Sequence, residues 1–468
     1  MTESLLFHDY ETFGTSPAFD RPAQFAAIRT DLNLNPIEEP IEIFCQPSSD
    51  YIPDPEACLI TGITPQQTMH KGVNESEFIG LINQHFSQPQ TCGVGYNSIR
   101  FDDEVTRFTL YRNFYDPYAR EWQNGNSRWD LIDVVRAFYA LRPEGIKWPM
   151  DDNDIPSFKL ENLTHANGLS HDNAHDALAD VRATIDLARI LKKAQPKLYD
   201  FALKLRDKRH VSSFFDLVNL KPLVHVSGMF GSSRGCVSWV VPVIWHPVNK
   251  NAMVVIDLSQ NILPLVKLDS ETIHDRLYTK REDLADNESP IPVKLIHVNK
   301  CPFVAPAGSL TAERAEQLGI DRQKCRANLE QLKASASVVR EKLADVFKIE
   351  RTFKANNPDG ALYQGFIKSA DKALMDVLHS VDPVAISQDA FNFEDHRLNQ
   401  LLFRYKARNY PYALTDSEQQ QWHAHLQNIL PELIEQRMHS LESLAQTHRN
   451  NPDKMKILKE LYQYMESF

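Results

Sequence analysis

The sequence of 468 residues has few cysteines and does not group them. The six cysteines stand at positions 45, 58, 92, 236, 301 and 325, with no Cys-x-x-Cys pair. This spacing argues against a zinc knuckle and a disulfide framework, and it is typical of a reducing cytoplasm, where we expect the protein. The sequence also lacks a GxxxxGK[ST] loop and an HExxH pair, so two common catalytic classes are without their residues.

Long apolar runs are missing as well. The longest, Val237 to Trp245, contains Pro242 and is too short to cross a bilayer. The N-terminus has neither a basic leader nor a cleavage site, so we expect no signal peptide and no membrane partner. A hydrophobic content of 42% and a charged content of 24% predict a soluble globular protein, and the length of 468 residues predicts two to four domains.

An excess of basic residues is also absent, because the net charge is −11. This sum does not exclude a nucleic-acid partner, since binding follows local patches rather than the whole chain. It does require that any DNA or RNA be bound in a localised basic groove.

The order of sequence patterns predicts three domains, at 1–196, 197–350 and 351–468. Residues 1–196 alternate strand and helix patterns, which is typical of an α/β domain with a mixed sheet. The expected strands are 4–11, 23–31, 37–45 and 91–96. The expected helices are 75–86, 102–114, 129–141, 158–167 and 175–193.

The middle and last parts differ from the first in pattern. After a helical start at 197–208, β-branched runs at 223–226, 236–244, 252–258 and 291–297 predict a small barrel or sandwich, closed by a helix near 322–347. A turn cluster at 356–360 precedes a mostly helical region, with helical periodicity at 420–436 and 453–465.

Two acidic residues occupy the first expected strand. Asp9 and Glu11 are two positions apart, so they project from one face of the strand. Two such carboxylates repel each other unless a cation lies between them, and a hard cation such as Mg²⁺ or Mn²⁺ fits oxygen ligands. The alternative is a strand with two acids facing solvent.

Three more residues have a setting that suits the same chemistry. Asp102 begins a helix, and the alternative is that it only complements the helix dipole. His175 stands at a loop–helix junction and Asp180 follows on that helix, although both types are also common there without a function. Together, Asp9, Glu11, Asp102 and Asp180 have the chemistry to hold two divalent ions about 4 Å apart, with His175 as the proton acceptor for an attacking water.

The residues in this order resemble the DEDDh group of exonucleases, which has a ribonuclease-H-like fold. The match extends through FHDYETFG, GYNSIRFDDEVTR, NLTHANGL, HDALADV and LLFRYKARN, and it resembles the bacterial exodeoxyribonuclease I family over nearly the whole chain. The resemblance implies an SH3-like β-barrel in the middle domain and an α-helical C-terminal domain. It also implies processive 3′-to-5′ hydrolysis of single-stranded DNA to deoxynucleoside 5′-monophosphates, in DNA repair and recombination.

Cations and aromatic rings are interleaved between Arg107 and Arg142, a combination suited to tracking phosphates and stacking bases. The predicted substrate-binding residues are Glu11, Arg107, Arg112, Tyr118, Trp122, Arg136 and Lys159. In the C-terminal domain, we expect one or two of Arg404, Lys406 and Arg408 to face DNA and the others to face solvent.

The resemblance also implies a protein partner. It predicts docking to the acidic C-terminal tail of single-stranded DNA-binding protein, for which Arg142 is a candidate contact. We expect a monomer, because the chain supplies its own clamp. Two alternatives stay open: an RNA-trimming or proofreading exonuclease of the same fold, and a catalytically idle single-strand-binding or scaffold protein.

Overall fold

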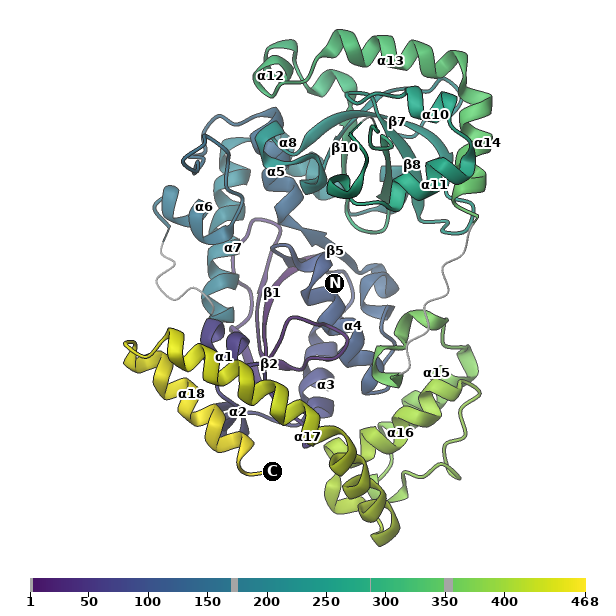
Figure 1. Ribbon diagram of the computed structural model, residues 1–468. Helices are drawn as coiled ribbons and strands as arrows, with labels where there is room; N and C mark the ends of the chain where they lie inside the picture. The colour runs from purple at the N-terminus through teal and green to yellow at the C-terminus, as the bar shows by residue number, and fades with distance from the viewer. Residues whose placement is uncertain (1–2, 170–175, 287, 349–356) are drawn as a thin grey trace. The chain divides into compact units, whose positions relative to one another are not determined.

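The computed structural model describes residues 3–169, 176–286, 288–348 and 357–468. The chain forms two compact units, each built from separate segments (Figure 1). The first unit combines Met1–Ser127, His171–Ile185 and Phe353–Phe468, and the second combines Arg128–Ser170 and Asp186–Thr352. In the described part of the chain, no helix is both long and apolar enough to cross a membrane.

The first unit holds most of a five-stranded mixed sheet and the C-terminal helices. Its strands are β1 (Ser4–Thr12), β2 (Pro22–Thr30), β3 (Ile41–Phe44) and β4 (Thr91–Gly95), and β5 (Ser127–Asp130) leads into the second unit. Its helices are α1 (Pro55–Thr61), α2 (Pro65–Lys71), α3 (Glu75–Phe86), α4 (Asp102–Arg112), α15 (Ser369–Leu378), α16 (His396–Asn409), α17 (Asp416–Thr447) and α18 (Pro452–Met465). Helix α7 (Ala177–Ala194) begins in this unit and ends in the other.

Strand β1 is central in the sheet order β3-β2-β1-β4-β5. It pairs antiparallel with β2, where Asp9 lies opposite Ala26, and parallel with β4, where Leu5 lies opposite Cys92. Because side chains alternate along a strand, Leu6 and Tyr10 enter one core with α3 and α4. The opposite face carries Asp9 and Glu11.

The C-terminal helices complete the core of this first unit. Phe108 and Tyr111 of α4 pack with residues of α15 and α16 in one buried cluster. Phe13, just after β1, packs with residues of α17 and α18, and these two helices contact α1 and α2 (Figure 1). Residues 357–468 are therefore part of the body that carries β1.

The second unit contains an antiparallel sheet in the order β10-β6-β7-β8-β9. Its strands are β6 (Leu223–Val226), β7 (Val237–Trp245), β8 (Ala252–Asp257), β9 (Val293–His297) and β10 (Phe303–Pro306). Its helices are α5 (Leu131–Leu141), α6 (Leu160–Ala166), α8 (Pro196–Lys204), α9 (Lys208–Ser212), α10 (Leu263–Lys267), α11 (Ser270–Tyr278), α12 (Ala312–Gln317), α13 (Arg322–Ala334) and α14 (Ala336–Val346).

Most predicted elements are confirmed, and the differences have local causes. The helix expected at 129–141 begins at Leu131, because residues up to Asp130 form strand β5 and the Asp130 side chain caps the helix. The helix expected at 322–347 is divided at Ser335, between α13 and α14. Strands β5 and β10 and the helices α1, α2, α10, α11 and α12 were not predicted.

A buried charge network joins α16 to the first domain. Arg408 donates to Asp359 and to Asp50 at 2.7 Å each, and all three side chains are buried. Arg404 also binds Asp359, at 2.8 Å, and Lys406 is buried against Glu418. The expectation that these three cations face DNA or solvent is wrong for Lys406 and Arg408, whose partners are carboxylates inside the unit.

Replacing Arg408 by methionine is expected to destabilise the protein by about 3–5 kcal/mol, because Asp50 and Asp359 then stay buried without their cation. Burial alone would raise the pKa of Asp50 and of Asp359, but the charge of Arg408 lowers both pKa values below their usual range. Both acids are therefore charged at neutral pH. Urea unfolding followed by circular dichroism measures the change.

The matched control is Arg189→Met, which breaks an ion pair with Asp186 that is 2.6 Å long and whose side chains are 44% and 40% exposed. This variant is expected to lose less than about 1 kcal/mol. Equal losses in the two variants would contradict a structural role for the buried network.

Candidate metal centre and nuclease site

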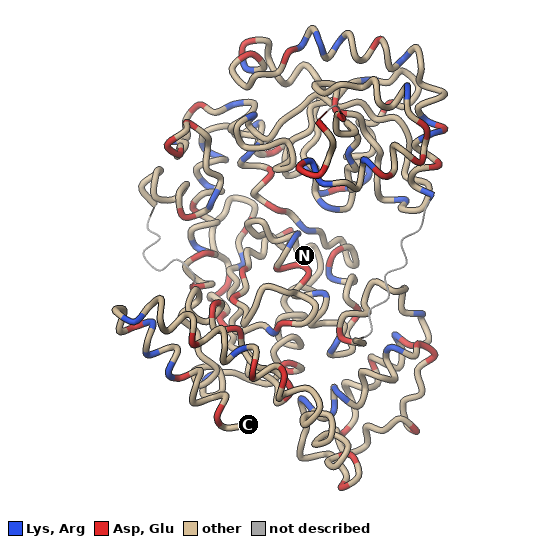
Figure 2. The backbone as a smooth tube through the Cα atoms, in the orientation of Figure 1, with Lys and Arg blue, Asp and Glu red and all other residues tan. Residues whose placement is uncertain are grey.

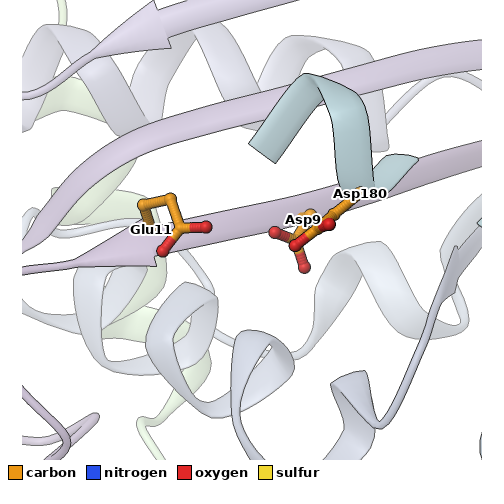
Figure 3. Close-up of side chains that lie close together, drawn as sticks. All are labelled: Asp9, Glu11 and Asp180. Atoms are coloured by element: carbon orange, nitrogen blue, oxygen red, sulfur yellow. The ribbon is translucent and has the colours of Figure 1, made fainter. Parts of the chain in front are cut away.

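Three carboxylates from two elements meet at the end of β1. Asp9 and Glu11 project from one face of this strand, and Asp180 comes from the first turn of α7. One oxygen of each lies within 4.8 Å of the others. Figure 3 shows the carboxylates of Asp9 and Asp180 next to each other, with that of Glu11 turned toward them from further along the strand. The structure therefore brings together three of the four predicted metal ligands.

The fourth predicted acid, Asp102, lies next to this group but outside the set of three. It occupies the first position of α4 and is buried. Its Oδ1 accepts a hydrogen bond of 3.2 Å from the backbone N–H of Tyr10, which stands between Asp9 and Glu11. Asp102 is thus attached to the strand that carries the other acids.

Burial and mutual repulsion change the acidity of this site. The pKa of Asp9 is raised well above its usual value. Burial is the largest cause, and repulsion from Asp102, Glu11 and Asp180 adds to it. The pKa of Glu11 is raised to about 9, mainly by burial and further by repulsion from Asp180, Asp102 and Asp176. A divalent cation would offset this repulsion and allow both groups to ionise.

The donor set fits a hard divalent cation. Among the described residues, the groups that converge here are carboxylates, whose oxygens suit Mg²⁺ or Mn²⁺. Within the described residues, Asp9, Glu11 and Asp180 are the one group with this clustering. They are the residues that would hold the ion.

His175, the predicted proton acceptor, lies outside the described residues. The next residue, Asp176, was not predicted, and it has two effects. Its carboxylate caps α7 by accepting from the backbone N–H groups of Leu178 and Ala179 at 3.0 and 3.1 Å. It also contributes to the repulsion at Glu11. An aspartate directly before the Ala-Leu-Ala start of a helix is the signal that would have identified this cap.

The predicted DNA contacts of the first unit have different settings. Trp122 is 63% exposed, whereas Tyr118 is half-buried with the Arg107 guanidinium 5.3 Å from its ring centre. Arg107 itself is buried between Glu104 and Glu121, at 2.7 Å from each. Arg112 is buried against Glu75 at 2.6 Å, which gives this arginine a structural role.

The other predicted contacts belong to the second unit. Lys159 is largely exposed and 3.8 Å from Glu161. Arg136 forms an ion pair of 2.7 Å with Asp133, its neighbour on α5. Arg142, the predicted partner contact, donates to the backbone carbonyl of Ser309 at 3.2 Å.

One string in this unit matches a hydrolase motif by its letters alone. Residues 231–235, Gly-Ser-Ser-Arg-Gly, fit the Gly-x-Ser-x-Gly pattern of a nucleophile elbow. They form a short 3₁₀ turn (Ser232–Arg234) between the antiparallel strands β6 and β7, whereas an elbow requires a strand followed by a helix. The candidate catalytic centre is therefore the cluster of Asp9 and Glu11 on β1 with Asp180 on α7.

Models of three protein families together match nearly the whole chain. They are Exonuclease (residues 6–188), Exonuclease I SH3-like domain (206–349) and Exonuclease I C-terminal domain (356–468). These matches and the mixed sheet with its acidic site define the class: a ribonuclease-H-like exonuclease with an SH3-like domain and a helical C-terminal domain.

Known proteins narrow this class to one family. Exodeoxyribonuclease I of Escherichia coli (strain K12) is 51% identical over 99% of this chain and 98% of its own length. A crystal structure of E. coli exonuclease I with a dA16 oligonucleotide has a TM-score of 0.97 at 50% identity, and covers 100% of both chains. The chain belongs to the exodeoxyribonuclease I family, and it is a hydrolytic nuclease.

Two further solved structures concern ligands and partners of such proteins. The zinc ion-bound form of an E. coli ExoI–ssDNA complex has a TM-score of 0.96 at 50% identity, and covers 100% of this chain and 99% of that one. A structure of SSB/exonuclease I with the inhibitor CFAM has a TM-score of 0.93 at 48% identity, and covers 100% of both chains.

The affinity of the protein for Mg²⁺ is expected to rise between pH 6 and pH 9. Glu11 holds a proton below a pKa of about 9, and the ion must displace it, so each unit of pH removes competition by up to about tenfold per proton. Isothermal titration in two buffers of different ionisation enthalpy measures both the affinity and the protons released.

Glu11→Gln serves as the control, because an amide binds no proton in this range. It should weaken Mg²⁺ binding and flatten its dependence on pH. An affinity in the unaltered protein that is equal at pH 6 and pH 9, without proton release, would show that Glu11 is already ionised in the metal-free state.

Proposed function

We propose that the chain is a processive 3′-to-5′ exonuclease that degrades single-stranded DNA to deoxynucleoside 5′-monophosphates. The observation that carries this proposal is the convergence of Asp9, Glu11 and Asp180 within 4.8 Å on β1 and α7. Full-length similarity to E. coli exonuclease I, which has been solved with DNA oligonucleotides, supports single-stranded DNA as the substrate.

In this mechanism, Asp9, Glu11, Asp102 and Asp180 hold two Mg²⁺ ions, for which Mn²⁺ substitutes. Such ions, when bound, supply charge that acidifies the attacking water and stabilises the departing 3′-oxygen. His175 accepts the proton of the water that attacks the terminal phosphodiester in line. The Tyr10 N–H directs the carboxylate of Asp102 toward β1.

The proposed DNA contacts follow from exposure. Trp122 and Lys159 are the predicted contacts with the most accessible side chains, and we assign base stacking to the first and a phosphate contact to the second. Tyr118, Arg136 and Glu11 stay in the proposed set. Arg107 and Arg112 are buried in ion pairs with glutamates. We therefore propose that they affect DNA binding indirectly, by holding the neighbouring elements in place.

The proposal includes the setting of the enzyme. The protein acts as a monomer in the cytoplasm, in DNA repair and recombination, and its domains are 1–196, 197–350 and 351–468. The solved SSB/exonuclease I structure supports the acidic tail of single-stranded DNA-binding protein as a partner, with Arg142 among its contacts.

A time course on a long single-stranded DNA labelled at its 5′ end tests substrate, polarity and metal dependence together. With Mg²⁺ we expect stepwise shortening from the 3′ end and release of mononucleotides, and with EDTA no cleavage. A labelled RNA of the same sequence should stay intact. A DNA strand that is bound but never shortened would instead support a binding protein, and faster loss of RNA would support an RNA-trimming enzyme.

Replacing His175 by alanine is expected to lower single-turnover hydrolysis by about 10²–10⁴-fold, because the attacking water loses its proton acceptor. Affinity for single-stranded DNA, measured by fluorescence anisotropy in EDTA, should not change. His165→Ala, a histidine on α6, is the matched control. If His175→Ala lost DNA affinity while turnover per bound complex was unchanged, the assigned role would be wrong.

A further inference from the structure

The first turn of α4 carries three acids, and the proposed mechanism uses only one. Asp102 belongs to the predicted metal ligands, whereas Asp103 and Glu104 do not. Asp103 is 2% exposed, so its charge is held inside the protein. A buried carboxylate requires a cation or several hydrogen bonds, and losing its partner costs several kcal/mol.

Arg120 supplies that cation. It lies in a 3₁₀ turn, η2 (Ala119–Glu121), and its Nη2 donates to Asp103 Oδ1 at 2.5 Å. The guanidinium is buried, with its central carbon 4.5 Å from the centre of the Phe86 ring. A flat cation fixed between a carboxylate and an aromatic face has little freedom to move.

The same turn of α4 is attached to β1 through the neighbouring acid. Asp102 Oδ1 accepts from the N–H of Tyr10, and the Asp102 carbonyl accepts from the Thr106 hydroxyl at 2.8 Å. The Thr106 hydroxyl also lies 3.1 Å from the hydroxyl of Tyr10. Asp102 and Asp103 therefore connect one helical turn to two supports, β1 on one side and η2 on the other.

The position of η2 does not depend on Arg120 alone. Glu121, the next residue, binds Arg107 further along α4, with oxygens at 2.7 and 2.9 Å. Just before the turn, Asp116 binds Lys372 of α15 at 2.6 Å. If Arg120 were lost, η2 would keep these two attachments, and the effect would be confined to the end of α4 that carries Asp102 and Asp103.

We propose that Arg120 is a positioning residue of the nuclease site: through Asp103 it fixes the first turn of α4, and so holds the Asp102 carboxylate against β1 beside Asp9 and Glu11. The inference rests on the proposed function, because it assigns Asp102 to that site. Its physical basis is that a misplacement of about 1 Å in a catalytic group lowers the rate by about 100-fold.

The test compares Arg120→Met with the double variant Arg120→Met/Asp103→Asn. The single variant leaves a buried charge unpaired and is expected to be less stable, whereas the double variant removes both charges and should fold normally. In the double variant we expect kcat on single-stranded DNA to fall at least about tenfold, with KM unchanged. Its affinity for Mn²⁺, measured by isothermal titration without DNA, should weaken several-fold.

Two more variants separate positioning from general stability. Arg120→Lys keeps the charge and should restore part of kcat. Arg29 is also a buried arginine, but it binds Ser4 and Thr91 at the opposite end of β1, at 2.8 and 2.9 Å. Arg29→Met should therefore lower the midpoint of thermal unfolding and leave kcat and Mn²⁺ affinity unchanged.

A double variant that is folded and has unaltered kcat and Mn²⁺ affinity would overturn the role of Arg120. A loss of kcat in Arg29→Met as large as in the double variant would also overturn it, since the effect would then be one of stability. Failure of the unaltered protein to hydrolyse DNA would contradict the proposed function separately, and the Mn²⁺ affinities would still decide whether Arg120 positions the acids.

Discussion

Repulsion among carboxylates at the end of a buried strand is the constraint on which the rest of this structure depends. Elsewhere in the first unit, four buried acids have an arginine partner. The pairs are Asp50–Arg408 and Asp359–Arg408 at 2.7 Å, Glu75–Arg112 at 2.6 Å and Asp103–Arg120 at 2.5 Å. Among the described residues, neither Asp9 nor Glu11 forms an ion pair. The fold thus pairs these four acids with arginines and leaves the site on β1 to an added cation.

The C-terminal region packs into the unit that carries these acids. Phe13, just after β1, packs with residues of α17 and α18. Helix α4 packs with residues of α15 and α16. Arg408 then fixes α16 to Asp50 and Asp359. Removing residues 361–468 would expose this core, so point variants are the better way to examine what the region contributes to processivity.

The sequence could predict what depends on local pattern. The period of two placed Asp9 and Glu11 on one face of β1, and helix and strand patterns located most elements. It could not separate an arginine that faces DNA from one that is buried. The partner of Arg112 is Glu75, 37 residues earlier, and that of Arg408 is Asp50, 358 residues earlier. Such pairs exist only in the folded chain. Family resemblance supplied the order of the motifs, but it did not indicate which neighbouring acid, Asp103, has its own cation.

The same use of arginines bears on how an acidic chain would bind DNA. Figure 2 shows acidic and basic residues interspersed along both units, with no single stretch holding the net charge of −11. Since Arg112, Arg120 and Arg408 are committed to buried carboxylates, fewer cations remain for phosphates. An exposed ring such as the proposed contact Trp122 would then add to affinity. Stacking on a ring accepts every base, because each has an aromatic face. An exonuclease that must advance over any sequence needs a contact of this kind, whereas hydrogen-bond readout of base edges would make it pause.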